Sequence, residues 1–245
     1  CRCPACGVVR PAPRAAARLA AGLWEPVCPR CGVEARAMPT PEDLAPDPAS
    51  VYGATKWQQE ILLSTLTRSS VVGGISLRFQ NVYGAGQALR NPYTGILPLF
   101  VAKGMAGEPM PLYEDGGMTR DFVHVDDAVR AILLALDRPE APGTVYNVGA
   151  GRPVTLREAA REIASALGVP DAPSVTGRYR LGDIRHACAD ISRASRDLGY
   201  RPEVPFADGI RELVAWARTQ PTIGSLAVRA EEELSARGLL GQGRV

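Results

Sequence analysis

The stretch Ser50-Val51-Tyr52-Gly53-Ala54-Thr55-Lys56 opens the segment on which the fold prediction depends. Ser50 can cap a helix, and good helix formers with apolar residues at helical spacing follow it. Tyr52 and Lys56 are four residues apart, so in a helix they stand on one face about one turn from each other. A phenol has a pKa near 10, so using it as a base near neutral pH requires stabilising the phenolate by about 4 kcal/mol. An adjacent ammonium supplies stabilisation of that kind.

The composition supports a special use of this lysine. Of the 28 basic residues, only Lys56 and Lys103 are lysines, and all the others are arginines. Arginine would replace Lys56 poorly, because its planar group is bulkier and its pKa is too high for proton relay. On spacing alone, a surface helix with an aromatic and a cation in register explains the pair equally well.

The first 38 residues form a separate cysteine-bearing unit. Cys3 and Cys6, and again Cys28 and Cys31, stand in Cys-Pro-x-Cys-Gly repeats that are separated by 21 residues. Such spacing lets four thiolates converge on one ion and predicts a zinc-ribbon-like site. Four thiolates leave no open coordination position, so we expect a structural zinc. A pair of disulfides is the alternative, and Cys1 is interpreted as a spare thiol.

Composition sets broad limits. A chain of 245 residues with 46% hydrophobic and 22% charged residues can bury a sizeable core. The net charge of +2 favours no nucleic-acid partner, and no apolar run or signal peptide indicates a membrane or export. We therefore expect a cytoplasmic protein. Because the chain begins with Cys1 and not with Met, we expect it to be a fragment with a natural N-terminus upstream.

The remaining pattern alternates strands and helices, which predicts an α/β fold. A proline-rich loop at residues 38–48 leads into the helix that follows Ser50. We expect a strand at 71–79, a helix at 95–106 and strands at 109–113 and 145–148. A helix opened by the capping box at Thr155 follows, and then a charged loop at 178–186. The last elements are a short helix ending at 198–199, a helix at 206–219, and a helix from 223 that ends in a frayed tail at 245. These elements divide into residues 1–38, residues 39–220 and a helical tail at 221–245.

Three motifs occur in a fixed order: Tyr52-x-x-x-Lys56, LRFQNVYG at residues 77–84, and TRDFVHVDD at residues 119–127. Together they resemble the extended short-chain dehydrogenase/reductases, and within them the NAD-dependent nucleotide-sugar epimerases and dehydratases. The resemblance covers residues 39 to about 218, and it implies the C-terminal part of a Rossmann-like fold with a substrate-binding α/β lobe. Residues 1–38 are similar to a cysteine-rich insertion in the subgroup of dTDP-L-rhamnose 4-epimerases.

The resemblance also implies roles for individual residues. Tyr52 and Lys56 would be catalytic and contact NAD, and Phe79 would lie near the nicotinamide. The residues implied to bind a nucleotide-diphosphate sugar are Asn81, Gly95, Ile96, Pro111, Tyr113, Arg120, Arg180, Asp183 and Arg185. Taken from the residues alone, a local turn explains Asn81, and packing explains Ile96 and Tyr113 equally well. His124, which follows an apolar strand, is interpreted as structural.

The expected activity is epimerisation at C4 of a dTDP-L-rhamnose-like or UDP-hexose substrate through a 4-keto intermediate, with a homodimer as the intact form. A 4,6-dehydratase or reductase, or a non-catalytic remnant carrying a zinc ribbon, are the alternatives. The strand followed by Gly149-Ala150-Gly151 lacks a third glycine and is interpreted as a tight turn. The family's Gly-x-x-Gly-x-x-Gly loop is not found in the sequence, so we expect little or no activity from these 245 residues alone. NAD-dependent epimerisation by them would contradict this expectation.

Overall fold

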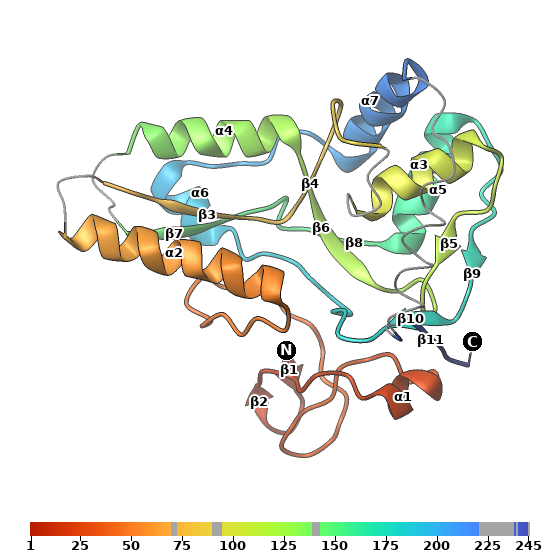
Figure 1. The fold of residues 1–245 in the computed structure, drawn as a ribbon, viewed down its shortest axis with the longest axis horizontal. Helices are drawn as coiled ribbons and strands as arrows, with labels where there is room; N and C mark the ends of the chain where they lie inside the picture. Colours follow the sequence, from red (N-terminus) through yellow and green to blue (C-terminus); the bar gives the residue numbers. More distant parts are fainter. Residues whose placement is uncertain (70–72, 90–94, 139–142, 221–237, 239, 245) are drawn as a thin grey trace.

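The computed structural model describes residues 1–69, 73–89, 95–138, 143–220, 238 and 240–244 (Figure 1). Its α/β architecture matches the predicted fold class. The part that carries the Tyr-x-x-x-Lys motif consists of α2 (Val51–Ser69), β3 (Ser76–Phe79), α4 (Val125–Leu136), β7 (Val145–Val148) and α6 (Ser192–Leu198). No helix among the described residues is both long and apolar enough to cross a bilayer.

Strands β3 and β7 form a parallel pair with helices on both sides. Ser76 pairs with Val145 and Phe79 with Val148, so both strands end at the same edge. Helices α2 and α4 lie on opposite sides of this pair (Figure 1). On the side of α4 and α6, Tyr146, Val148, Leu198 and Tyr200 are buried in one apolar cluster. The expected strand at 71–79 is shorter than predicted, since residues 73–75 are not in a strand and residues 71–72 lie outside the described part.

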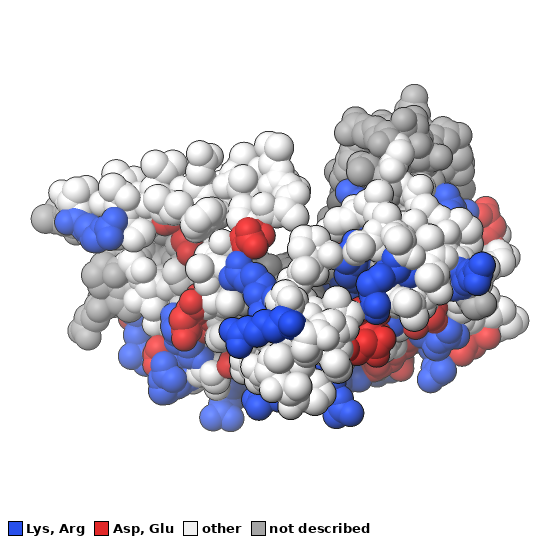
Figure 2. All heavy atoms as spheres, turned by 90° about the horizontal axis from the view of Figure 1, so that it is seen from below, with Lys and Arg blue, Asp and Glu red and all other residues white. Residues whose placement is uncertain are grey.

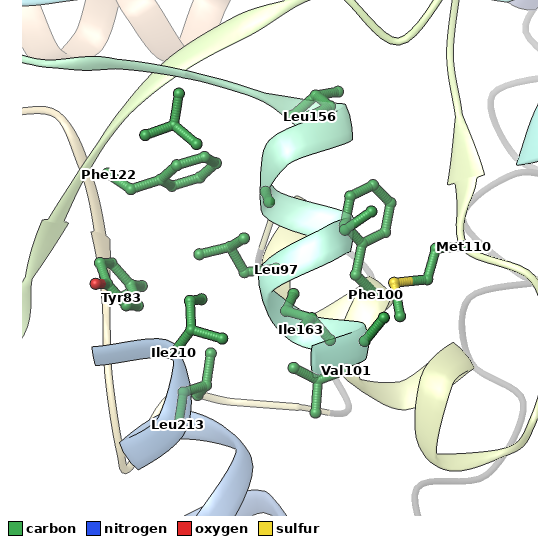
Figure 3. Packing of buried hydrophobic residues seen from close by; sticks show 14 of the residues in the cluster. Tyr83, Leu97, Phe100, Val101, Met110, Phe122, Leu156, Ile163, Ile210 and Leu213 are labelled. Carbon is green, nitrogen blue, oxygen red and sulfur yellow. The ribbon is translucent and has the colours of Figure 1, made fainter. Parts of the chain in front are cut away.

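A second lobe packs around α5. Its elements are β4 (Asn81–Tyr83), α3 (Ile96–Met105), β5 (Pro111–Leu112), β6 (Thr119–His124), β8 (Pro153–Thr155), α5 (Leu156–Leu167), β9 (Ser174–Val175) and α7 (Phe206–Arg218). Figure 3 shows Phe100, Ile163 and Leu213 in the core between α3, α5 and α7. Strand β6 pairs in parallel with β4 and antiparallel with β8, while β5 pairs with β9.

Caps fix the ends of several helices where the sequence predicts them. The Ser50 Oγ accepts a hydrogen bond from Gly53 N at 3.1 Å, and the Thr155 Oγ1 accepts one from Glu158 N at 3.0 Å. Helices α5 and α6 end at Gly168 and Gly199 with φ of 68° and 72°, a left-handed backbone that glycine adopts without strain. The predicted capping residues at 50 and 155 are therefore confirmed.

The charged segment and the tail differ from the prediction. The segment at 178–186, expected to be an unstructured loop, begins with β10 (Arg178–Arg180). This strand pairs antiparallel with β11 (Leu240–Gln242), which lies in the tail that we expected to fray. The two strands are about sixty residues apart in the sequence, so no pattern within a few residues of either strand could predict their pairing. Most of the expected tail helix, residues 221–237, falls outside the described residues.

Residues 1–38, here called the cysteine module, contain little regular structure. They hold the hairpin of β1 (Arg2–Cys3) and β2 (Gly7–Val8) and one short helix, α1 (Ala16–Ala20). The module lies beside one end of α2 and next to β10 and β11 (Figure 1). Figure 2 views this side, where basic and acidic groups are interspersed. Ion pairs between charged side chains make up much of the contact between the module and the rest of the described chain.

Candidate active site

Tyr52 and Lys56 lie on one face of α2, as their spacing predicts. The Lys56 Nζ is 5.7 Å from the centre of the Tyr52 ring. Tyr52 is 72% exposed, and its side chain faces open space. The ammonium therefore lies against the ring of the tyrosine, as helical spacing predicts.

A groove of about 1260 Å³ runs past these two side chains. Phe79, at the carboxyl end of β3, and Asp183 also line it. Open α/β sheets bind ligands at the carboxyl ends of their parallel strands. The groove therefore joins the Tyr-x-x-x-Lys helix to the charged segment, and it offers Tyr52, Lys56 and Phe79 as one wall that could receive a nicotinamide.

Arg78 fixes α2 against the strand pair at the base of the groove. Its guanidinium donates to the two carboxylate oxygens of Glu60 at 2.9 and 2.7 Å and to the Glu42 carbonyl oxygen at 2.9 Å. The Glu42 carboxylate in turn accepts a hydrogen bond from Asn147 N at 2.9 Å. Bidentate geometry holds a helix more specifically than a single charge contact does. The sequence pattern assigned Arg78 no role, although it lies inside the LRFQNVYG motif.

Arg120 and Asp183 are brought together from positions 63 residues apart. Arg120 donates to Asp183 Oδ1 at 3.0 Å and to the Thr119 carbonyl oxygen at 2.8 Å. Burial lowers the pKa of the Arg120 guanidinium, and the Asp183 charge opposes that shift. Asp183 lines the groove while Arg120 lies behind it. In this geometry Arg120 supports the expected ribose-binding carboxylate directly.

Arg185, expected as a second phosphate contact, is occupied by three carboxylates. Its guanidinium lies 2.8 Å from Glu25, 2.9 Å from Glu114 and 2.7 Å from Asp115, and its side chain is 5% exposed. Burial alone would lower the pKa of Arg185, but Asp115 and Glu25 outweigh burial and raise it. A phosphate could reach this guanidinium only by displacing one of the carboxylates, so the geometry argues against the phosphate contact.

The other expected substrate residues do not line this groove. Asn81 begins β4 and is exposed, and Arg180 is exposed at the end of β10, with no ion-pair partner among the described residues. Tyr113 stacks under Arg178, whose guanidinium carbon is 5.8 Å from the ring centre. The remaining three lie at the start of α3 and in β5: Gly95, Ile96 and Pro111. Their binding roles stay predictions.

The Gly149–Gly151 turn binds a side chain of the protein itself. The Asp121 carboxylate accepts hydrogen bonds from Ala150 N at 2.7 Å and Gly151 N at 3.1 Å. The interpretation of a tight turn is therefore confirmed. His124 is 3% exposed and its Nδ1 caps α4 by accepting from Asp126 N, in agreement with a structural role.

The four predicted cysteine ligands meet in the cysteine module. The Sγ atoms of Cys3, Cys6, Cys28 and Cys31 all lie within 4.8 Å of one another. The Cys3 and Cys31 sulfurs are 3.5 Å apart, which is too far for a disulfide. A zinc ion bound tetrahedrally at about 2.3 Å requires sulfurs roughly 3.8 Å apart. The donor set and its spacing therefore fit a four-thiolate metal site.

Sequence reasoning assigned no role to Arg10, Arg14 and Glu25 of the cysteine module. Arg10 and Arg14 line the same groove as Tyr52. Arg10 donates to the Ala45 carbonyl oxygen and lies 3.3 Å from Asp47. These residues are far in sequence from the elements they meet, so no local spacing could have identified them.

Comparisons with known proteins show what this chain is similar to. Residues 31–149 match the NAD dependent epimerase/dehydratase family. The dTDP-L-rhamnose 4-epimerase of Burkholderia thailandensis is 40% identical over 210 residues, which are 85% of this chain and 56% of that protein. A UDP-glucose 4-epimerase from Thermotoga maritima, solved with UDP-glucose, is 33% identical with a TM-score of 0.68 over 76% of this chain and 59% of its own.

The UDP-glucose 4-epimerase of Thermus thermophilus, solved in complex with NAD, is 29% identical with a TM-score of 0.64, covering 82% of this chain and 63% of its own. The chain thus spans little more than half the length of the Burkholderia relative. The order of motifs, the Rossmann-like strand pair and these likenesses lead to one conclusion. Residues 31–149 of this chain belong to the NAD dependent epimerase/dehydratase family.

Proposed function

We propose that this chain supplies the catalytic helix and the substrate-binding part of an NAD-dependent 4-epimerase that acts on a nucleotide-diphosphate sugar. The observation that carries the proposal is the Tyr52–Lys56 pair, which faces a groove shared with Asp183. The 40% identity to a dTDP-L-rhamnose 4-epimerase makes a dTDP-L-rhamnose-like sugar the favoured substrate, and a UDP-hexose is the next candidate.

In this proposal Tyr52 acts as the base for the C4 hydroxyl of the sugar. Its phenolate takes the proton of the C4 hydroxyl. It later returns a proton to the C4 oxygen of the sugar, which then has the opposite configuration. Lys56 favours the phenolate through its positive charge. Bound NAD supplies the chemistry of accepting a hydride from C4 and giving it back. Phe79 is exposed beside the pair and fits a flat cofactor ring at the end of β3.

The nucleotide part must stay fixed while the sugar turns. We assign Asn81 and Arg180 to the diphosphate, and Asp183, held by Arg120, to the ribose hydroxyls. Arg180 suits a phosphate because it is exposed and free of a carboxylate partner among the described residues. A guanidinium then forms charge-assisted bonds to the diphosphate oxygens.

Two further assignments accompany the reaction. We assign one structural zinc to Cys3, Cys6, Cys28 and Cys31, because four thiolates close the coordination shell. We also assign a homodimer through α2. None of the nineteen residues of this helix is buried, and Leu62 is 62% exposed.

The test separates binding from chemistry. Calorimetry measures the binding of dTDP and UDP to the 245-residue chain, to Arg180→Ala and to Arg152→Ala, a control arginine that pairs with Glu158 on the surface. We expect Arg180→Ala to weaken binding about tenfold, because a charge-assisted bond is lost, and Arg152→Ala to leave it unchanged.

Chemistry is followed as inversion at C4 by proton NMR of the sugar. The assay uses a fusion protein and added NAD. The fusion protein joins this chain to the part of the Burkholderia relative that this chain does not match. Tyr52→Phe should abolish turnover, because it removes the proton acceptor, while the nucleotide dissociation constant changes less than about twofold. Loss of both would make Tyr52 structural, and failure of the unmodified chain to bind either nucleotide would refute the proposal.

A further inference from the structure

The cysteine module touches the segment that carries the proposed nucleotide-binding residues. Glu25 Oε1 lies 2.9 Å from Arg185 Nε, and Glu25 Oε2 lies 2.9 Å from His186 Nε2. Arg14 donates to the Asp183 carbonyl oxygen at 2.9 Å. Two side chains of the module therefore hold three of the four residues 183–186.

A second layer of contacts makes the junction a buried one. Arg14 pairs with Glu114 at 2.7 Å, and their side chains are only 9% and 1% exposed. Trp24 packs on Tyr179 of β10, with ring centres 6.3 Å apart, and Leu19 joins them in one buried cluster. Buried ion pairs depend on geometry, because each charge needs its partner to offset the loss of water. The junction is thus sensitive to small movements of the module.

On its other side the segment rests on β6. Thr119 N donates to the Arg185 carbonyl oxygen at 3.0 Å, and Thr119 Oγ1 is 2.9 Å from His186 Nδ1. Arg120, the next residue of β6, holds Asp183. His186 therefore bridges β6 and Glu25 with its two ring nitrogens. The position of Asp183 in the groove depends on both neighbours, β6 and the module.

The cysteine cluster fixes both ends of the stretch that makes these contacts. Arg14, Trp24 and Glu25 all lie among the 21 residues between Cys6 and Cys28. That stretch has one five-residue helix and no strand pairing longer than the β1–β2 hairpin, so little regular structure holds it in shape. An ion bound by the four thiolates would join its two ends and restrict its motion.

We infer that the metal site of the cysteine module positions the nucleotide-binding segment, and that Glu25 is the positioning residue that transmits this effect through Arg185 and His186. The inference rests on the proposed function only in naming the ligand. Metal bound at the four cysteines holds residues 7–27, Glu25 holds Arg185 and His186, and Asp183 is kept at the groove beside Tyr52. The module is therefore part of the substrate site and not only an appendage.

The primary test needs no substrate. Hydrogen exchange measured by mass spectrometry compares peptides covering residues 178–186 with peptides covering α5, in the zinc-loaded chain, after zinc removal by a chelator, and in Glu25→Gln. Glu34→Gln is the matched control, since Glu34 belongs to the same module, is exposed and forms a long ion pair with Arg18 at 3.9 Å. Metal content is measured on each sample. Before chelation, one zinc per chain is expected in the unmodified chain, in Glu25→Gln and in Glu34→Gln.

Chelation and Glu25→Gln should each speed exchange in residues 178–186 and leave α5 unchanged, while Glu34→Gln should change neither. Zinc should remain bound in Glu25→Gln, and Glu25→Asp should recover part of the protection because it keeps the carboxylate. Unchanged exchange in 178–186 after zinc removal, or failure of the chain to take up zinc on titration, overturns the inference.

Nucleotide binding then separates this inference from the proposed function. In calorimetry with dTDP and UDP, zinc removal and Glu25→Gln should each weaken binding about tenfold, the effect of one lost charge-assisted contact at the segment. If the zinc-loaded chain binds neither nucleotide but the exchange differences are present, the proposed function fails and the positioning role stands. If nucleotides bind equally with and without zinc, the positioning role fails and the proposed function stands.

Discussion

At the scale of single residues, Asp121 connects three parts of the chain. It is fully buried, and its carboxylate accepts hydrogen bonds from Ala150 N, Gly151 N and Ala189 N at 2.7 to 3.1 Å. Burial raises the pKa of this carboxyl, while the three N–H donors oppose the rise. One side chain thus accepts the hydrogen bonds of backbone N–H groups in the turn after β7 and in the segment that leads into α6.

We expect Asp121→Asn to destabilise the fold by about 2–3 kcal/mol, because an amide N–H₂ would face backbone donors that then lack an acceptor. Urea unfolding followed by circular dichroism measures the change. Asp171→Asn is the control, since Asp171 forms an exposed ion pair with Arg161, and its effect should stay within about 0.5 kcal/mol. Equal effects of the two substitutions would mean that the buried carboxylate does not hold the turn.

At the scale of elements, helices α2 and α5 depend on different surroundings. Helix α5 buries Leu156, Ala160 and Ile163 in the core, so its apolar face and cap agree with its packing. Helix α2 also begins at a cap, but its apolar face is much weaker, and it buries none of its residues in the described chain. Arg78 and Glu60 hold it against β3 instead. The catalytic spacing on α2 thus follows from local helix geometry, while its placement depends on one bidentate pair.

Thr155→Ala should cost about 1 kcal/mol, because Glu158 N loses the hydroxyl that caps the first turn of α5. Thermal unfolding monitored by circular dichroism gives the change. Thr65→Ala on exposed α2 serves as the comparison. The Thr65 hydroxyl only donates back to the Ile61 carbonyl oxygen, and alanine is the better helix former, so no loss is expected there. A loss at position 65 as large as at position 155 would contradict the capping role.

At the scale of the whole molecule, the junction between the cysteine module and the larger lobe is built from charges. The hydrogen bond from His186, with help from Arg185, holds the pKa of Glu25 below its ordinary value of 4.5, although burial opposes this. For Asp115 burial would raise the pKa, but Arg185 and Gly117 N outweigh it and lower it. Carboxylates with lowered pKa values contribute stability above their ordinary pKa and lose it as the pH falls through the lowered values.

The difference in melting temperature between the unmodified chain and Glu25→Gln should therefore be largest near pH 6 and shrink as the pH falls below about 4.5. Scanning calorimetry from about pH 6 to about pH 3.5 measures it, as far as unfolding is reversible. Zinc content is measured at each pH, and only the range in which both proteins keep their zinc is compared, because loss of zinc would itself release Glu25. A difference that stays constant over this range would show that Glu25 does not act as a paired carboxylate.

Much of the fold could be predicted because its signals are local. The start of α2 at Ser50, the cap of α5 at Thr155 and the strand at Val145–Val148 follow from caps and apolar patterns within a few residues. The strand β10 could not be predicted, because its partner β11 lies about sixty residues away. Likewise, no sequence rule indicated that Arg185 would meet three carboxylates from two distant segments, Glu25 from one and Glu114 and Asp115 from the other.

The sequence by itself determined the chemistry that depends on spacing: Tyr52 and Lys56 on one helical turn, and two cysteine pairs able to share an ion. Helix pitch and thiolate geometry are set over four residues, so no distant contact is needed to specify them. Only the tertiary structure decided which arginines face the groove, because a charge is free for a ligand only if no folded neighbour neutralises it. Arg10, Arg14 and Arg185 all line the groove, and each is paired with a carboxylate there: Arg10 with Asp47, Arg14 with Glu114, and Arg185 with Glu25, Glu114 and Asp115.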